Sequence, residues 1–371
     1  MQINLFAEET QLQKLTKLGD SLEKLNIIDF ESFRPLLVSA ARKERKNNAG
    51  RPAFDVVMMF KVLVLQRLFN LSDDQTEYQI TDRMSFQRFI GLSLGEHVPD
   101  AKTIWLFRDT LTKSGVMEEL FAKFNAMLIE NGMITHTGTI VDATFVDAPR
   151  QRNSRDENKQ IKNGETPAEW KKNPHKLAQK DTDARWTKKN NETHFGYKDH
   201  VKVDADSKII TDYTATAANV HDSNHFTEFL TEEDQVVYAD SAYVGKEIPN
   251  HVENCVCEKG YRNHPLTDEQ KANNRKKSKI RCRIEHVFGY MTGSMHGITL
   301  RSIGMKRAEF NIGLTNLVYN MCRYTIFEAK RGMSEIMMPL REITSIFWED
   351  RLGIWEKHYI GFAFFGGRRL K

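Results

Sequence analysis

Cysteine is scarce in this sequence and long hydrophobic runs are absent. The 371 residues include four cysteines, too few to hold a chain of this size by disulfides: Cys255, Cys257, Cys282 and Cys322. The most apolar stretch, residues 54–71, is broken by Asp55, Lys61, Gln66 and Arg67, so we expect no membrane span and no membrane partner. The first residues lack the basic-then-apolar pattern of an export signal. These absences favour a cytoplasmic protein with reduced thiols.

Several catalytic and binding motifs are also missing. Neither a phosphate-binding loop nor a dinucleotide-binding loop occurs, so nucleotide hydrolysis is not expected. No serine stands in a nucleophile elbow, and no Tyr or Ser has a context that favours covalent attachment to DNA. The spacing of Cys255 and Cys257, with Cys282, His251 and His264 near them, is not that of a zinc finger, so structural thiols are expected.

Positive charge is concentrated in two segments. Residues 150–200 contain thirteen Lys and Arg against eight Asp and Glu, and residues 259–283 contain nine against two, whereas the whole chain has a net charge of only +4. Two basic blocks on an otherwise acidic chain indicate a polyanion partner such as nucleic acid. Either block alone is also explained by ordinary solvated loops.

The first 132 residues have the pattern of an all-helical N-terminal domain. Residues 54–71 are apolar around most of a helix circumference, which predicts a central helix, and Gly50-Arg51-Pro52 precedes it. Shorter helices are expected after Ser72, over 85–90, over 102–111 after Asp100, and over 116–130. This order fits a DNA-binding helix-turn-helix module and fits a plain helical bundle equally well.

After Gly132 the pattern changes to that of one α/β domain, residues 133–330. Strands are expected over 139–146, 196–204, 208–216 and 235–238, with a hairpin turn at 205–207, and helices over 224–230, 279–291 and 306–330. A polar insertion or mobile loop is expected over about 150–195. The tail, residues 331–371, is rich in aromatic residues, and we expect it to dock on this chain or on another.

Three acids stand where the local pattern does not require them. Asp142 interrupts an apolar strand, Asp240 follows another strand, and Glu285 lies in the helix expected over 279–291. Each alone is explained by a turn or a salt bridge, but an isolated buried carboxylate is costly. Together they suit two divalent cations, since Mg²⁺ prefers carboxylate oxygens and paired metals serve phosphodiester displacement.

In five blocks the sequence resembles the insertion-sequence-5 group of bacterial DDE transposases, related to the insertion-sequence-4 group. The blocks are IVDAT at 140–144, GYKDHVKVD at 196–204, AANVHDS at 217–223, YADSAY at 238–243, and Arg281 with Glu285 four residues later. The resemblance runs from the helix after Gly50 to about Lys330. It implies that Asp142, Asp240 and Glu285 form the metal-binding triad of a ribonuclease-H-like mixed sheet flanked by helices.

The last block, that of Arg281 and Glu285, departs from the family pattern at two positions. Such transposases commonly have a Tyr three residues before the Arg and a Lys seven after the Glu, whereas this chain has Ser278 and Thr292. In the family these two positions handle the DNA strands.

Further basic residues are candidates for DNA contact. Arg281 and Glu285 are four apart on the expected helix, so Arg281 either forms a surface ion pair or donates to a phosphate as a catalytic residue. Lys198, His200 and Lys202 alternate on one strand face, which suits DNA backbone contact or simply the polar face of an edge strand. The second basic block adds Lys276, Lys277, Lys279 and Arg283 as candidate backbone contacts.

The resemblance implies a transposase that binds terminal inverted repeats, cuts the element ends and joins them to target DNA. It implies two Mg²⁺ ions, replaceable by Mn²⁺, double-stranded DNA as partner, a homodimer or larger synaptic assembly, and a place in the bacterial cytoplasm at the nucleoid. A metal-dependent nuclease without strand transfer and a non-catalytic DNA-binding remnant are the alternatives. Inverted repeats flanking the coding region would separate them.

Overall fold

The computed structural model describes residues 7–41, 52–93, 95–189 and 191–349, with side chains from residue 9 to residue 331. Gly50, Arg51 and residues 350–371 lie outside the described residues, as do the side chains of Phe347 and Trp348, so the expected docking of the tail stays a prediction. By packing, the described residues up to 325 form one compact unit, and those from 326 onward form another. Among the described residues no helix is long and apolar enough to cross a membrane.

The N-terminal region is helical, as predicted. It contains α1 (Ala7–Lys17), the 3-10 turns Glu23–Ile27 and Phe30–Phe33, α2 (Arg34–Ala41), α3 (Val56–Leu68), α4 (Asp73–Asp82), α5 (Met84–Ile90), α6 (Ala101–Ser114) and α7 (Met117–Glu130). Helix α3 is central because its apolar residues surround the axis and most are fully buried. Ser72 closes a capping box with Gln75 at the start of α4, and Asp100 caps α6, so both predicted starts are confirmed.

One mixed sheet forms the centre of the remaining region. Its strands are β1 (Thr139–Asp147), β2 (Arg185–Lys189), β3 (Glu192–Asp204), β4 (Ile210–Ala217), β5 (Val236–Tyr238) and β6 (Glu253–Asn254), in the order β2-β3-β1-β5-β6 with β4 also paired to β3. Strand β3 is antiparallel to β1, β2 and β4, whereas β1, β5 and β6 are parallel. The expected α/β class, a mixed sheet with helices after an all-helical region, is confirmed.

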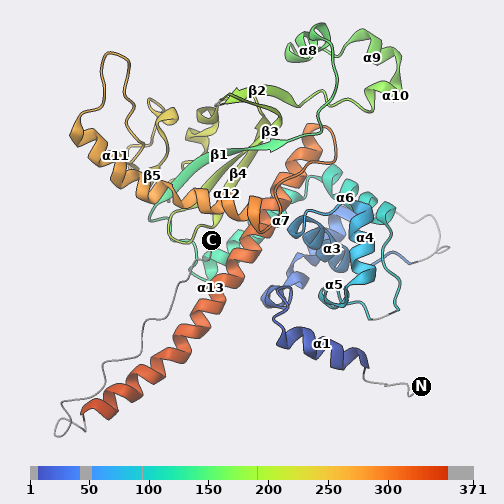
Figure 1. The fold of residues 1–371 in the computed structure, drawn as a ribbon, viewed down its shortest axis with the longest axis vertical. Coiled ribbons are helices and arrows are strands. Elements are labelled where there is room, and N and C mark those ends of the chain that lie inside the picture. Colours follow the sequence, from blue (N-terminus) through green and yellow to red (C-terminus); the bar gives the residue numbers. More distant parts are fainter. Residues whose placement is uncertain (1–6, 42–51, 94, 190, 350–371) are drawn as a thin grey trace, which may run out of the picture. The chain divides into compact units, whose positions relative to one another are not determined.

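Helices pack against the sheet and against the long β3–β4 hairpin. They are α11 (Asp268–Arg281), α12 (Arg283–Gly293) and α13 (Met305–Glu349), and Figure 1 shows α12 beside the strands and α13 as the long orange-red helix. Ile312 of α13 and Leu300 before it are buried with Val146 of β1 and Tyr197 of β3. On the other face, Val141 and Val237 are buried with Phe226 and Tyr243.

Two predicted elements differ from those observed. The helix expected over 224–230 is a pair of 3-10 turns, Asp222–His225 and Thr227–Phe229. The helix expected over 279–291 is broken at Cys282 into α11 and α12, so Arg281 ends one helix and Glu285 lies in the first turn of the next.

The segment expected as a polar insertion or loop has regular structure. It contains α8 (Arg155–Lys162), α9 (Ala168–Lys172), α10 (Pro174–Leu177) and strand β2, and in Figure 1 its three helices project from the sheet. Trp170 is completely buried there, Ile161 is nearly so, and Ser154 closes a capping box with Glu157. Each helix is too short for its periodicity to stand out in the sequence, which is why the prediction of a loop was wrong.

Candidate active site

The register of two parallel strands brings Asp142 and Asp240 together. Ile140 of β1 pairs with Tyr238, the last residue of β5; Asp142 follows two residues later within β1, and Asp240 follows two residues after the end of β5. Parallel strands are about 4.8 Å apart and equivalent positions point to the same face, which places the two carboxyl groups near each other at the end of β5, and the charge of Asp240 acts on Asp142. Asp240 also begins the 3-10 turn Ser241–Tyr243, where its side chain accepts a 2.7 Å hydrogen bond from the Ala242 N–H.

The environment of Asp142 disfavours negative charge. Burial raises the pKa of its carboxyl to about 6; the 2.8 Å hydrogen bond from the Ala143 N–H opposes that rise, and the negative charge of Asp240 adds to it. A cation placed between the two carboxylates would remove the repulsion that raises this pKa. The pair therefore has the oxygen chemistry and the electrostatic demand of a divalent-cation site.

Arg281 lies between Asp142 and Glu285. Its Nη1 is 3.8 Å from the Asp142 Oδ2, and its Nη2 is 3.4 Å from the Glu285 Oε1. The Glu285 side chain is 62% exposed, whereas that of Asp142 is 21% exposed. The guanidinium thus occupies the side of Asp142 that faces α12, although the helix that was expected to carry both residues is interrupted.

The described part of the chain contains no group of three His, Cys, Asp or Glu side chains with metal-binding geometry. The cysteines are free thiols, as expected. Asp142 and Asp240 fit a divalent cation as a pair, and Glu285 is separated from Asp142 by the Arg281 guanidinium. The roles predicted for the three acids and for Arg281 stay predictions.

Lys198, His200 and Lys202 do not form an exposed row. Their strand, β3, has β1 on one side and β2 and β4 on the other, and all three residues are buried. Lys198 bonds Asp222 at 2.6 Å and Lys202 bonds Asp234 at 2.7 Å.

In the register with β1, Asp142 pairs with Val201, so the three side chains point to the opposite face from Asp142. The expectation of an edge strand was wrong, because the sequence does not reveal that β2 and β4 cover this side of β3. Direct DNA contact by these side chains is excluded in this conformation. Burial also lowers the pKa of His200 to about 4, which keeps the imidazole neutral.

In the second basic block, residues 259–283, some of the candidate side chains are exposed and could contact DNA. Lys276 and Lys279 are exposed on α11, whereas Lys277 donates to the Val256 carbonyl at 2.9 Å. Arg283 is held by the Ala205 carbonyl and by Asp206, each at 2.8 Å. Lys276 and Lys279 remain the accessible members of the predicted DNA-contacting set.

Tyr243 is a residue that the sequence reasoning did not select. It is buried beside the two aspartates, and its hydroxyl has no hydrogen-bond partner among the described residues. Burial and the negative charges of Asp142, Asp222 and Asp240 raise the pKa of its hydroxyl. The signal was present, since Tyr243 closes the YADSAY block that carries Asp240.

Two family models match the chain. One, described as a transposase DDE domain, matches residues 134–321, and the other, described as a transposase domain, matches residues 10–110. No solved structure matches. Since the first model covers half of the sequence, the chain belongs to the DDE transposases, of the insertion-sequence-4/5-like kind.

The family defines the chemistry. This protein is a transposase whose domain cleaves DNA and transfers strands, with DNA as substrate and a divalent metal ion as cofactor. The catalytic match begins just before β1 and ends within α13, so it spans Asp142, Asp240, Arg281 and Glu285.

Proposed function

We propose that Asp142, Asp240 and Glu285 hold two Mg²⁺ ions at the end of β5, and that this site cuts and joins the ends of an insertion sequence. The observation that carries the proposal is the register of β1 and β5, which supports two carboxylates at one point with a raised pKa at Asp142. The bound ions, Mg²⁺ or Mn²⁺, supply charge neutralisation and activation of the attacking oxygen.

In this proposal the chain's own side chains position the substrate. Asp142 and Asp240, fixed by backbone N–H bonds from Ala143 and Ala242, present oxygens that need no reorganisation. Glu285 stands in the first turn of α12 and reaches the site once Arg281 turns away. Arg281 then exchanges its carboxylate contacts for a scissile or adjacent phosphate, which it can grip with two parallel N–H donors.

The DNA partners extend beyond the catalytic site. We propose that the helical region, residues 1–132, recognises the terminal inverted repeats, and that Lys276 and Lys279 contact backbone. Two element ends must meet, so the working form is a homodimer or larger synaptic assembly. It acts in the cytoplasm on nucleoid DNA.

The test supplies pre-cut element-end DNA, target DNA and Mg²⁺ or Mn²⁺ to the full chain. Joined product is expected from a transposase, and cutting without joining would instead favour the nuclease. Loss of both reactions in Asp240→Asn, with end binding retained, is expected if the acid pair is catalytic. Wild-type rates in Asp240→Asn would contradict the assignment.

A further inference from the structure

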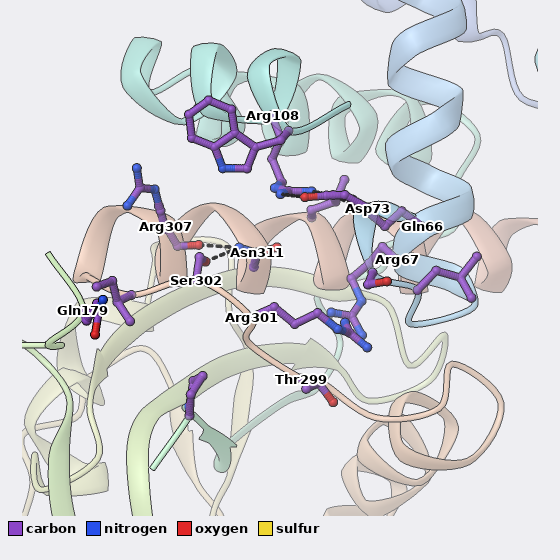
Figure 2. Close-up of a pocket in the computed structure, with 16 residues that line it drawn as sticks. Gln66, Arg67, Asp73, Arg108, Gln179, Thr299, Arg301, Ser302, Arg307 and Asn311 are labelled. Carbon is purple, nitrogen blue, oxygen red and sulfur yellow. Dashed lines mark hydrogen bonds and ion pairs between the residues drawn. The ribbon is translucent and has the colours of Figure 1, made fainter. Parts of the chain in front are cut away.

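Four arginines surround a pocket away from the acid pair. We call it the arginine pocket: Arg67 of α3, Arg108 of α6, Arg301 in the segment before α13, and Arg307 of α13 (Figure 2). Its volume is about 500 Å³, within the ~300–1,000 Å³ typical of ligand sites. Asp73 is the one acidic residue in its lining.

Two of the four arginines have a carboxylate partner, although Arg307 shares its partner, Asp109, with Lys113. Arg108 grips Asp73 with both terminal nitrogens, at 2.6 and 2.8 Å, and Arg307 lies 3.0 Å from Asp109. Asp73, the acidic residue of the lining, is thus hydrogen-bonded to Arg108, and no carboxylate of the lining is hydrogen-bonded to Arg67 or Arg301.

Arg67 and Arg301 have only neutral acceptors among the described residues. Arg67 donates to the Gly297 carbonyl, and Arg301 donates to the carbonyl and side-chain oxygens of Asn70, at 2.7 and 3.0 Å. Arg67 is 5% exposed, and its Nε is buried without a hydrogen-bond partner in the described chain. A buried cation without a counter-charge is costly, so this arrangement calls for an anion.

The two charges also oppose each other. Burial and the positive charge of Arg301 lower the pKa of Arg67 to about 10. Burial and the positive charge of Arg108 lower the pKa of Arg301, and the negative charge of Asp73 offsets part of that fall. An anion between them would supply the counter-charge that buried Arg67 lacks and would offset its repulsion by Arg301. Thr299 and Ser302 line the same pocket and add hydroxyl donors.

We infer that the arginine pocket binds a backbone phosphate of the DNA substrate through Arg67 and Arg301. Guanidinium groups match phosphate oxygens with paired donors, which suits a phosphodiester. The inference rests on the proposed function, because it takes the DNA to be the substrate of the acid pair.

The position of the pocket suits a long duplex. Pro149 in its lining is seven residues beyond Asp142, at most roughly 23 Å along an extended chain at ~3.3 Å per residue. One duplex could therefore contact the acid pair and the pocket at once, within about seven nucleotides at ~3.4 Å per phosphate. Arg301 is exposed at the pocket, where a phosphate would enter.

The test compares Arg301→Gln with Arg34→Gln in the full chain. Arg34 is the matched control because Glu31 and Asp55 already neutralise it, each at 2.6 Å. Binding of an element-end duplex and of an unrelated duplex is measured by fluorescence anisotropy between about 50 and 200 mM salt. Arg301→Gln should reduce the slope of log K against log salt by about 1 on both duplexes and weaken binding about tenfold. Arg34→Gln should behave as wild type.

Methylphosphonate substitution locates the contact. Duplexes are prepared in which a single phosphate is neutral. At one position the neutral phosphate should weaken binding by wild type but should not weaken binding by Arg301→Gln, which already lacks the contact. A slope and a phosphate profile equal to those of wild type would overturn the inference. Arg301→Gln removes one of two repelling charges, so its melting temperature should equal or exceed that of wild type, which separates a lost contact from misfolding.

Two further outcomes are distinguishable. If the element end binds no better than the unrelated duplex, the proposed end recognition fails, yet the slope difference on both duplexes still reports the pocket. Inorganic phosphate is the second probe. Inorganic phosphate could raise the melting temperature of wild type but not of Arg301→Gln, while both proteins show the same slope of log K against log salt for DNA. In that case the pocket binds a small phosphate-bearing molecule, and the DNA assignment is overturned.

Discussion

Asp142 of β1 and Asp199 of β3 both have raised pKa values, and their surroundings differ. Asp142 faces a second acid, Asp240, and an arginine, so a cation has a place beside it. Asp199 of β3 is completely buried, and the one hydrogen bond that it receives, 3.1 Å long, comes from the Asn316 amide. Burial raises the pKa of Asp199 to about 8. Asp142 is therefore a candidate for chemistry, whereas Asp199 is a protonated structural group.

Replacing Asp199 with asparagine should change how stability depends on pH. The folded chain keeps a proton that the unfolded carboxyl releases near its ordinary pKa of 3.8, so the free energy of unfolding should fall as pH rises from about 4 to about 8. Asp199→Asn removes the titrating group, so this fall should shrink, with a gain of about 1–3 kcal/mol at pH 8. Urea unfolding at several pH values measures it. Asp82→Asn, at an exposed residue of α4, is the control. If the free energy of unfolding of Asp199→Asn depended on pH as that of wild type does, the assignment would be contradicted.

Replacing Asp142 with asparagine should abolish DNA cleavage and leave DNA binding intact. The amide keeps the shape of the carboxyl but removes the charge that a divalent cation needs, so we expect a loss of at least about 10²–10³-fold in the cleavage rate. Single-turnover cleavage of end DNA, with anisotropy for binding, measures both properties. Asp147→Asn, at the exposed end of the same strand, should cleave normally. Equal rates for Asp142→Asn and wild type would remove Asp142 from the site.

At the scale of elements, the insertion depends on one aromatic side chain. Trp170 is completely buried between α8 and α10, its Nε1 donates to Glu157 at 2.6 Å, and the Lys180 ammonium lies 5.1 Å from its ring. Trp170→Ala should cost about 3–5 kcal/mol locally and open the three short helices, while the sheet stays folded. Hydrogen exchange should show lost protection over α8–α10 alone. Trp186→Ala, at a side chain 40% exposed, is the milder control. Protection retained in α8–α10 would show that Trp170 is not their anchor.

The sequence predicts those helices and strands that have a clear hydrophobic pattern or a helix-capping residue. The capping residues Ser72 and Asp100 place the starts of α4 and α6, and the β-branched and apolar residues around Asp142 place β1. The family blocks select Asp142, Asp240, Arg281 and Glu285, and the register of β1 and β5 adds the pairing of the two aspartates. The local sequence pattern therefore predicts which residues form the candidate site, but it does not predict how they are arranged in space.

The features that escape prediction depend on contacts between distant segments. No glycine or proline marks Cys282, where α11 ends and α12 begins. Lys198 and Lys202 read as solvent-facing because their carboxylate partners, Asp222 and Asp234, come more than twenty residues later. The arginine pocket likewise joins residues of α3 and α6 to residues after 298, which no local pattern could indicate.

At the scale of the whole molecule, the helical region and the sheet share one core. Asn125 of α7 donates to the Ile210 and Thr211 carbonyls of β4, at 3.1 and 3.0 Å, and accepts from Asn320 of α13 at 3.0 Å. The rings of Phe121 and Tyr213 meet edge to face, with centroids 4.8 Å apart. The predicted boundary between residues 132 and 133 is therefore not expected to separate two independently folding parts, even if it separates two functions.

Residues 133–330 expressed alone should consequently fail to unfold cooperatively. Without α7, the β4 carbonyls and Tyr213 lose the partners that bury them, and such unsatisfied groups cost about 1–3 kcal/mol each. Residues 1–330, which keep α7 and lack the tail, are the matched control and should melt in one transition. Asn125→Ala in the full chain should lower the free energy of unfolding by a similar amount, about 1–3 kcal/mol. Calorimetry with near-ultraviolet circular dichroism checks all three chains. A sharp transition of residues 133–330 near the melting temperature of residues 1–330 would show that the sheet folds without α7, and that recognition and catalysis are joined by docking and not by a common core.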